Sequence, residues 1–195
     1  MSDLYPWGGK YNTGNPESPV AVVTLDTDFD FPEDKVAIWG KMKTENLGIE
    51  KVIANVISNP YIRFLIICGK EIRGHRSGNT LKAIAENGLD ENGRIIDAPG
   101  AVPYIENIES EAVERFRKQV CVIDKIDITE REPIMEEINS ISEDDPGRFG
   151  EPFIAIKVKK EEKSKLKADL ALHASLNITP WGEISSADKD NTISN

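Results

Sequence analysis

The sequence has few of the residues that most often build metal clusters or redox centres. Its 195 residues include two cysteines, Cys68 and Cys121, and two histidines, His75 and His173. The cysteines are far apart, lie in apolar segments and form no Cys-x-x-Cys spacing. This pattern excludes a zinc cluster, a dithiol redox centre and a disulfide scaffold. It favours the cytoplasm as the compartment.

Long apolar runs are also absent. The longest unbroken run, residues 64–68, is far shorter than the roughly 18 residues that a membrane-spanning helix needs. The first ten residues do not show a basic segment followed by an apolar one, so we expect no signal peptide. The sequence therefore predicts no membrane span and a cytoplasmic protein.

Basic residues are in the minority. The chain has 24 Lys and Arg residues against 34 Asp and Glu residues, which gives a formal net charge of −10 at pH 7. Duplex nucleic acid and anionic membranes bind broad basic surfaces, and an acidic chain offers little of that kind. We therefore expect no nucleic-acid partner.

The charge divides the chain into two parts. Residues 159–195 contain six lysines and six acidic residues, so the whole net charge belongs to residues 1–158. Apolar residues make up 39% of the chain, enough for the core of one domain. We predict a ligand-binding domain over 1–158. We predict that 159–195 is a polar tail, helical over 163–176 and disordered over 185–195, that cofactor binding does not need.

Alternating strand and helix signals predict an α/β fold of the Rossmann-like kind. The clearest helix is 47–58, where apolar residues recur three and four positions apart, and the clearest strand is 62–68, a nearly unbroken apolar run. Such alternation predicts a mostly parallel sheet with helices on both faces, and ligands bind at the carboxyl ends of its strands. The expected strands are 20–25, 62–68, 94–96, 120–126 and 153–158, and the expected helices are 47–58, 79–87, 110–118 and 130–141.

The loop after the clearest strand, residues 69–78, reads Gly-Lys-Glu-Ile-Arg-Gly-His-Arg-Ser-Gly. Its first two glycines have the spacing of a P-loop, but His75 and Arg76 stand where the lysine and the hydroxyl residue belong. The Gly-x-Gly-x-x-Gly spacing of dinucleotide-binding loops is absent from it. Nucleotide hydrolysis and nicotinamide binding are therefore disfavoured. An enzyme that binds a phosphate ligand through the amides of this loop is the weakest of three functions, and the other two are described at the end of this section.

His75 is the candidate for chemistry in this loop, because it is the only histidine within 1–158 and it follows a buried strand. A neutral imidazole can bind a metal through one nitrogen and donate its other N–H to a carboxylate. Glycines beside it would let a flat group approach the backbone. His75 and Gly78 match half of the Asp-x-His-x-x-Gly motif of cobalamin-dependent enzymes, although Arg73 replaces the aspartate. On these residues alone, an ordinary surface histidine near a helix start is the more frequent explanation.

Three other segments have both a structural and a functional interpretation. Residues 44–48 contain a helix cap, with Thr44 as the capping candidate, or they meet a cofactor. The carboxylate behind His75 is Glu45, Glu50 or Glu71, and the sequence does not choose among them. Residues 99–103 form either a wall for a flat ligand or a loop packed on protein, and Gly14 and Asn15 have the composition of a turn.

Several long segments together resemble one family, the A subunit of tetrahydromethanopterin S-methyltransferase, which is the corrinoid-carrying component of a sodium-pumping methyltransferase of methanogens. The resemblance covers most of residues 11–158. Its segments are Gly14–Val22, Thr44–Lys51, Ile57–Pro60, Ile62–Phe64, Gly74-His75 with Gly78, Gly100–Asn107, Glu114–Phe116 and Asp145–Gly147.

The resemblance implies a Rossmann-type domain that binds cobalamin or a related cobamide, the 5-hydroxybenzimidazolyl cobamide in the family. It implies that His75, in the Gly-His-x-x-Gly segment, is the axial ligand of cobalt and the catalytic residue. The other implied cofactor-binding residues are Gly14, Asn15, Thr44, Glu45, Asn46, Leu47, Gly48, Gly69, Gly74, Gly78, Pro99, Gly100, Ala101, Val102 and Pro103.

The function implied by the resemblance is methyl transfer in the one-carbon metabolism of methanogenesis. Co(I) would accept a methyl group from methyl-tetrahydromethanopterin or a related donor, and coenzyme M or a related thiol would receive it. We expect partner subunits that bring the donor and the acceptor to the cobalt. Because the family carries a carboxyl-terminal membrane anchor and this chain has no such run, we expect a cytoplasmic homologue. The alternative is a non-catalytic module that senses or stores a corrinoid.

Overall fold

The computed structural model describes residues 4–155, 176–178 and 184–186. The chain divides into two compact units, Met1–Ile156 and Lys157–Asn195. In the second unit, the described residues are the strands β6 (Leu176–Ile178) and β7 (Ile184–Ser186), which pair antiparallel. Among the residues that the structure describes, no helix combines the length and the apolar character needed to cross a bilayer.

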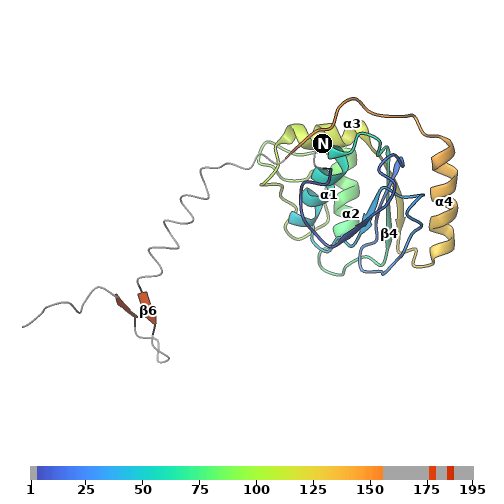
Figure 1. Ribbon diagram of the computed structural model, residues 1–195. Helices are drawn as coiled ribbons and strands as arrows, with labels where there is room; N and C mark the ends of the chain where they lie inside the picture. The colour runs from blue at the N-terminus through green and yellow to red at the C-terminus, as the bar shows by residue number, and fades with distance from the viewer. Residues whose placement is uncertain (1–3, 156–175, 179–183, 187–195) are drawn as a thin grey trace, which may run out of the picture. The chain divides into compact units, whose positions relative to one another are not determined.

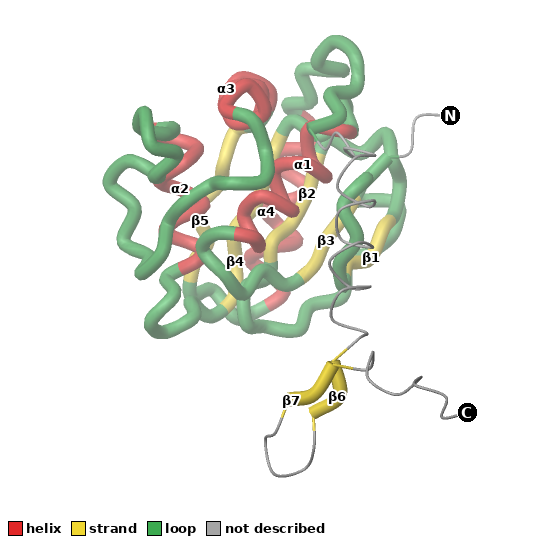
Figure 2. The backbone as a smooth tube through the Cα atoms, turned by 90° about the vertical axis from the view of Figure 1, so that its left-hand side faces the viewer, coloured by secondary structure: helices red, strands yellow, loops and turns green. Residues whose placement is uncertain are grey.

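The first unit is built on a five-stranded sheet with the strand order β1-β3-β2-β4-β5 (Figure 2). The strands β2 (Val20–Val23), β3 (Ile38–Gly40), β4 (Phe64–Gly69) and β5 (Cys121–Ile126) are parallel to one another. The edge strand β1 (Tyr11–Thr13) is antiparallel to β3. The expected mostly parallel sheet is confirmed.

Helices cover both faces of this sheet, as predicted. Figure 1 shows α1 (Leu47–Ser58), α2 (Ser77–Asn87) and α3 (Ser110–Gln119) on one side and α4 (Arg131–Glu143) on the other. The two faces correspond to two apolar clusters. α1, α2 and α3 contribute to one cluster, and α4 shares the other with the long connection between β2 and β3.

The strongest periodic signals give the elements that they predict. In α1, Ile49, Ile53 and Ile57 lie on the buried side and are fully buried, which is why the predicted helix bounds agree with those observed. In β4, Leu65 belongs to the cluster on one face and Ile66 to the cluster on the other. Burial of one such side chain contributes roughly 1.5–3 kcal/mol, so this central strand stabilises both layers.

Weaker signals were less reliable. The expected strand at 94–96 is reduced to isolated bridges, Leu89 with Ile95 and Arg94 with Tyr104. Residues 153–155 of the expected strand 153–158 form no strand, because Phe153 bonds to the carbonyl of Ile57 at the end of α1 instead of joining the sheet. The short strands β1 and β3 were not anticipated, since three residues carry too little periodicity.

Predictions about the tail fall mostly outside the described residues. The helix expected over 163–176 lies there apart from Leu176, which belongs to β6. Of the end that was expected to be disordered, Ser185 and Ser186 belong to β7, so that expectation was wrong for them, and the remainder is not described. The role of residues 159–195 in cofactor binding stays a prediction.

We expect the two thiols to react very differently with iodoacetamide. Cys68 is fully buried in β4, and burial raises the pKa of its thiol to about 12, whereas Cys121 is exposed. Thiolate is the reactive form. Mass spectrometry of the folded protein should therefore find Cys121 modified and Cys68 unmodified until denaturant is added. In a Cys121→Ser control, native labelling should vanish, and rapid labelling of Cys68 in that folded variant would contradict its placement in the core.

Candidate functional site

The site forms around a pair of side chains, His75 and Glu45, that are 30 positions apart in the sequence. His75 lies in the loop between β4 and α2, and Glu45 precedes α1. The imidazole Nδ1 is 2.7 Å from Oε2 of Glu45. The carboxylate is buried, with 3% of its side chain exposed, while the imidazole is 51% exposed. A buried anion therefore holds an imidazole whose other side faces the surface.

Donors around Glu45 favour its ionised form. Its second oxygen, Oε1, accepts a hydrogen bond from the backbone N–H of Val102 at 3.0 Å. Burial by itself raises the pKa of Glu45, but hydrogen bonds from its own backbone N–H, from Val102 and from His75 outweigh that effect. The pKa of Glu45 therefore lies below its ordinary value of 4.5. An ionised carboxylate only accepts hydrogen bonds, so Nδ1 carries the proton and Nε2 is the nitrogen left for a metal.

The start of α1 fixes the position of Glu45. The side chain of Asn46, the N-cap residue, accepts a bond from the Leu47 N–H at 2.7 Å. Thr44, the capping candidate from the sequence, is not at the N-cap position, but its hydroxyl accepts a bond from the Gly48 N–H at 2.9 Å. Thr44 and Asn46 thus share the unpaired donors of the first turn, and Glu45 between them is free to turn toward His75.

Glu71 fixes the loop that carries His75. Its carboxylate accepts bonds from the backbone N–H groups of Gly78 and Asn79 in the first turn of α2, at 3.1 and 2.9 Å. Its own N–H donates to Asp127 after β5, at 3.0 Å. Glu71 therefore ties together both ends of the segment around His75. The carboxylate of Glu50 binds elsewhere, to the N–H groups of Glu106 and Asn107.

Residues 99–103 form the third wall of the site. Gly100 packs so tightly there that a Cβ atom would lie 2.7 Å from Cγ of Glu45 and 2.8 Å from the hydroxyl oxygen of Thr80. The Thr80 hydroxyl in turn donates to the carbonyl of Arg76. Thr80 was not among the predicted site residues, and only its position five residues after His75 in sequence could have indicated it.

Most of the candidate glycines are close to protein atoms rather than to open space. A Cβ atom on Gly69, at φ +82°, would meet the Thr24 carbonyl at 2.3 Å, and one on Gly78 would meet Leu25 at 2.8 Å. Gly48 is similarly crowded by Met42 and Thr44. Gly74 differs, because nothing lies within 4 Å of its Cβ position. Gly74 is thus the glycine beside His75 that leaves room for a ligand.

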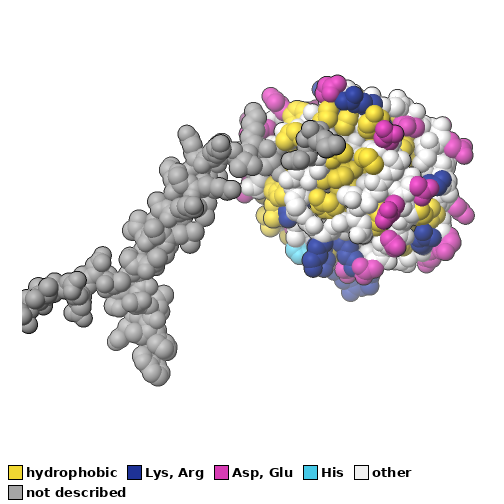
Figure 3. All heavy atoms as spheres, in the orientation of Figure 1, with side chains coloured by type: hydrophobic (Ala, Val, Ile, Leu, Met, Phe, Trp, Pro, Cys, Tyr) yellow, Lys and Arg dark blue, Asp and Glu magenta, His cyan; other side chains and the backbone are white. Residues whose placement is uncertain are grey.

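The surface around His75 combines apolar and basic groups. Leu47 and Val102, which flank Glu45 through the helix start and the 99–103 loop, are 44% and 53% exposed. Lys70, Arg73 and Arg76 lie on the histidine loop itself, and all three are exposed. Figure 3 shows the histidine at the rim of the domain with Lys and Arg side chains beside it. An acidic protein thus places basic groups next to its exposed imidazole.

Two of the predicted cofactor-binding residues lie elsewhere. Thr13 pairs with Ile38, the first residue of β3, so Gly14 and Asn15 lie at the amino-terminal edge of the parallel strands. There their N–H groups donate to the carbonyls of Ala37 and Glu33. The His75 loop is at the opposite, carboxyl-terminal edge. The remaining candidates lie at the end of β4, in the segments that lead into α1 and α2, and in the 99–103 loop; these are Thr44, Glu45, Asn46, Leu47, Gly48, Gly69, Gly74, His75, Gly78, Pro99, Gly100, Ala101, Val102 and Pro103.

The site offers one imidazole that is held by one carboxylate. Within residues 4–155 and the two short strands of the tail, no group of three or more His, Cys, Asp or Glu side chains converges as a metal site. One oriented imidazole suits a metal whose other ligands come with a macrocycle.

Comparison with known proteins identifies one family. The family model for the A subunit of tetrahydromethanopterin S-methyltransferase matches residues 2–166. The A 1 subunit of this enzyme from Methanothermobacter thermautotrophicus is 50% identical over 155 residues, 78% of this chain and 65% of the relative. The A 2 subunit from Methanobrevibacter ruminantium is 50% identical over 160 residues, 80% and 83% of the two chains. The A subunit of the methyltransferase Mtx from Methanosarcina barkeri is 49% identical over 157 residues, which cover 80% of this chain and 79% of the relative. The chain thus spans less than two thirds of the first of these relatives.

Replacing Glu45 by Gln should destabilise the protein in a pH-dependent way. At pH 7 the variant loses the charge-assisted bond to His75, so we expect a decrease of about 1–2 kcal/mol in the free energy of unfolding. Because the pKa of Glu45 is lowered on folding, its contribution is complete above its ordinary pKa of 4.5 and is lost as the pH falls through the lowered folded value. Urea titrations should show that the free energies of unfolding of the two proteins differ at pH 7 and become similar near pH 3. The same difference at both pH values would contradict this account.

Substitution of Gly100 by Ala tests the packing behind the carboxylate. The added methyl group would overlap Glu45 and Thr80, so we expect a loss of about 1–3 kcal/mol in stability. Gly8→Ala is the matched control, since nothing lies within 4 Å of its Cβ position. Thermal unfolding of both variants gives the comparison, and equal melting temperatures would show that the 99–103 loop yields freely.

Proposed function

The chain belongs to the family of the tetrahydromethanopterin S-methyltransferase A subunit, and on this premise we propose that it binds a corrinoid and carries methyl groups. The observation that supports this best is the His75–Glu45 pair. A buried carboxylate bonded to Nδ1 of a half-exposed imidazole is the arrangement of a histidine that ligates a metal through Nε2.

The groups around His75 fit a flat macrocycle. Gly74 has open space on its Cβ side, and Leu47 and Val102 expose apolar surface near the imidazole. Apolar side chains suit the hydrocarbon parts of a corrin ring, and the absence of a Cβ atom lets the ring approach the loop. We propose that Gly74, His75, Leu47 and Val102 face the cofactor, and that the crowded glycines Gly48, Gly69, Gly78 and Gly100 maintain the shape of the site.

Each residue has a separate part in this proposal. Glu45 holds the proton on Nδ1, which fixes the tautomer and makes Nε2 a better donor. Val102 holds Glu45, and Glu71 holds the two ends of the histidine loop. A bound corrinoid would supply a cobalt centre that accepts and releases a methyl group. The protein would orient the imidazole, and it would leave the corrinoid accessible to partner subunits.

Partner subunits follow from the same proposal. The relatives are named as A subunits of methyltransferases, and we propose that this chain likewise works with subunits that present the methyl donor and the acceptor. The donor would be methyl-tetrahydromethanopterin or a related compound, and the acceptor would be coenzyme M or a related thiol. The site described here lies wholly within the first unit, so we propose that residues 1–158 suffice for corrinoid binding. A cytoplasmic location stays a prediction.

The test is titration of the apo-protein with hydroxocobalamin, followed by its visible spectrum. Wild-type protein should give the spectrum of a histidine-ligated Co(III) corrinoid. His75→Ala should lose that spectrum and bind at least about tenfold more weakly, as an axial ligand is lost. His173→Ala is the matched control and should behave like wild type. An unchanged spectrum in His75→Ala would overturn the assignment.

A second arm separates a methyl carrier from a storage or sensor module. The cobalamin-loaded protein is reduced and mixed with a methyltransferase fraction and methyl-tetrahydromethanopterin. A carrier should take up isotope-labelled methyl groups in proportion to the bound cobalt, and it should release them to coenzyme M. A loaded protein that binds cobalamin through His75 but acquires no label would instead be a storage or sensor module.

A further inference from the structure

A cavity lies beside α1, and its lining includes Lys43 and Gly48, which are close in sequence to Glu45. It has a volume of about 750 Å³, which is within the range of small-molecule sites. Its walls come from residues 7–12 of the amino-terminal segment, from β2 and β3 with the loops that follow them, and from one side of α1. Neither His75 nor Glu45 is among its lining residues, so the cavity is distinct from the imidazole that we propose to bind cobalt.

The amino-terminal segment closes this cavity through specific bonds to α1. The side chain of Asn55 accepts from the N–H of Trp7 and donates to its carbonyl, both at 2.8 Å. Two residues before Trp7, the N–H of Tyr5 donates to the hydroxyl of Ser58 at 2.9 Å. The segment then continues into β1 at the edge of the sheet. The cavity is therefore bounded by fixed backbone on both sides.

Its lining is basic, although the protein is acidic. Lys10, Lys41, Lys43 and Lys51 line the cavity, and Asp28 is the acidic residue among its lining. Asp28 pairs with Lys41 at 2.8 Å and is itself 94% exposed. Three lysines thus remain without an acidic neighbour in the lining, in a chain whose net charge is −10. A cleft with one sign of charge concentrates ligands of the opposite sign.

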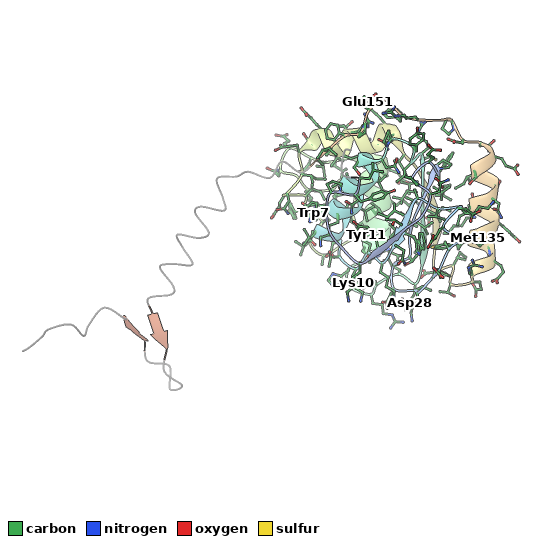
Figure 4. The ribbon with its side chains drawn as sticks, viewed as in Figure 1. Trp7, Lys10, Tyr11, Asp28, Met135 and Glu151 are labelled. Atoms are coloured by element: carbon green, nitrogen blue, oxygen red, sulfur yellow. The ribbon has the colours of Figure 1, made fainter. Side chains whose placement is uncertain are left out.

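The other walls are aromatic and aliphatic. Trp7 and Tyr11 line the cavity on the side of the amino-terminal segment, and Ile38, Met42 and Val52 line it from the sheet and α1. Figure 4 shows Trp7, Tyr11 and Lys10 near one another, with Asp28 at the lower edge of the domain and Met135 on α4 at the opposite side from Trp7. Aromatic faces and aliphatic side chains accommodate a planar ring, and lysines beside them accommodate an anion.

We propose that this cavity binds a planar ring that bears a phosphate group. Two sources share that chemistry: a free nucleotide-like metabolite, and the nucleotide arm that a complete cobamide carries below its corrin ring. The first source is independent of the proposed function, and the second rests on it. In both, Lys43 and Lys51 hold the phosphate, and Trp7 and Tyr11 contact the ring.

The first experiment titrates the protein with adenosine 5′-monophosphate and records the heat of binding. The double variant Lys43→Gln, Lys51→Gln should raise the Kd for this probe by about tenfold, because two charge-assisted contacts are lost. The pair Lys35→Gln, Lys118→Gln is the matched control, since both lysines are exposed, lie outside the lining and change the net charge equally. His75→Ala should leave this binding unchanged, which keeps it separate from the corrinoid proposal.

The second experiment compares cobalamin with cobinamide, a corrinoid that lacks the nucleotide. If the nucleotide arm occupies the cavity, the Lys43→Gln, Lys51→Gln variant weakens cobalamin and not cobinamide, and adenosine monophosphate competes with cobalamin alone. If a free ligand occupies it, adenosine monophosphate binds the cobalamin-loaded protein undiminished. Either result supports the proposal. It is overturned if the double variant changes neither the affinity for adenosine monophosphate nor the preference for cobalamin over cobinamide.

Discussion

A buried carboxylate needs hydrogen-bond donors, and the donors of Glu45 come from two other segments at the carboxyl-terminal edge of the sheet. Its two oxygens accept bonds from His75 and from the Val102 backbone, 30 and 57 positions away. These bonds join the start of α1, the loop after β4 and the 99–103 loop. Without them an ionised group would be left in an environment where an unpaired charge is costly. The exposed imidazole is thus positioned by the requirement to satisfy its buried neighbour.

Close packing of glycines against neighbouring residues maintains this arrangement. Gly100 lies against Glu45, Gly78 against Leu25 and Gly69 against the carbonyl of Thr24, each at a distance that no side chain would allow. Glycines near a candidate ligand are readily interpreted as room for that ligand, and here the geometry assigns most of them to contacts within the protein. Gly74 is the exception, and its open side is next to His75. The site therefore combines a rigid base with a single permissive position at the surface.

Charge is distributed over the same edge in a way that the net charge conceals. The chain carries an excess of ten negative charges, yet basic side chains surround His75 and line the cavity beside α1. α1 borders both regions. Glu45, which holds His75, lies just before the helix, and Lys51 and Val52 of the helix line the cavity. The start of one helix therefore lies between the carboxylate that orients the imidazole and a basic cavity.

The sequence by itself determined the elements with strong periodicity and the residue types of the site. The isoleucine stripe of α1 and the apolar run of β4 are local patterns that burial enforces, and the histidine after β4 indicated which loop would carry the candidate site. Tertiary structure decided what no local pattern contains. Glu45, Glu50 and Glu71 are alike in sequence, but one bonds His75, one binds Glu106 and Asn107, and one caps α2. The reason is physical: a carboxylate's role is set by the donors that folding brings to it, and those donors come from loops remote in the chain.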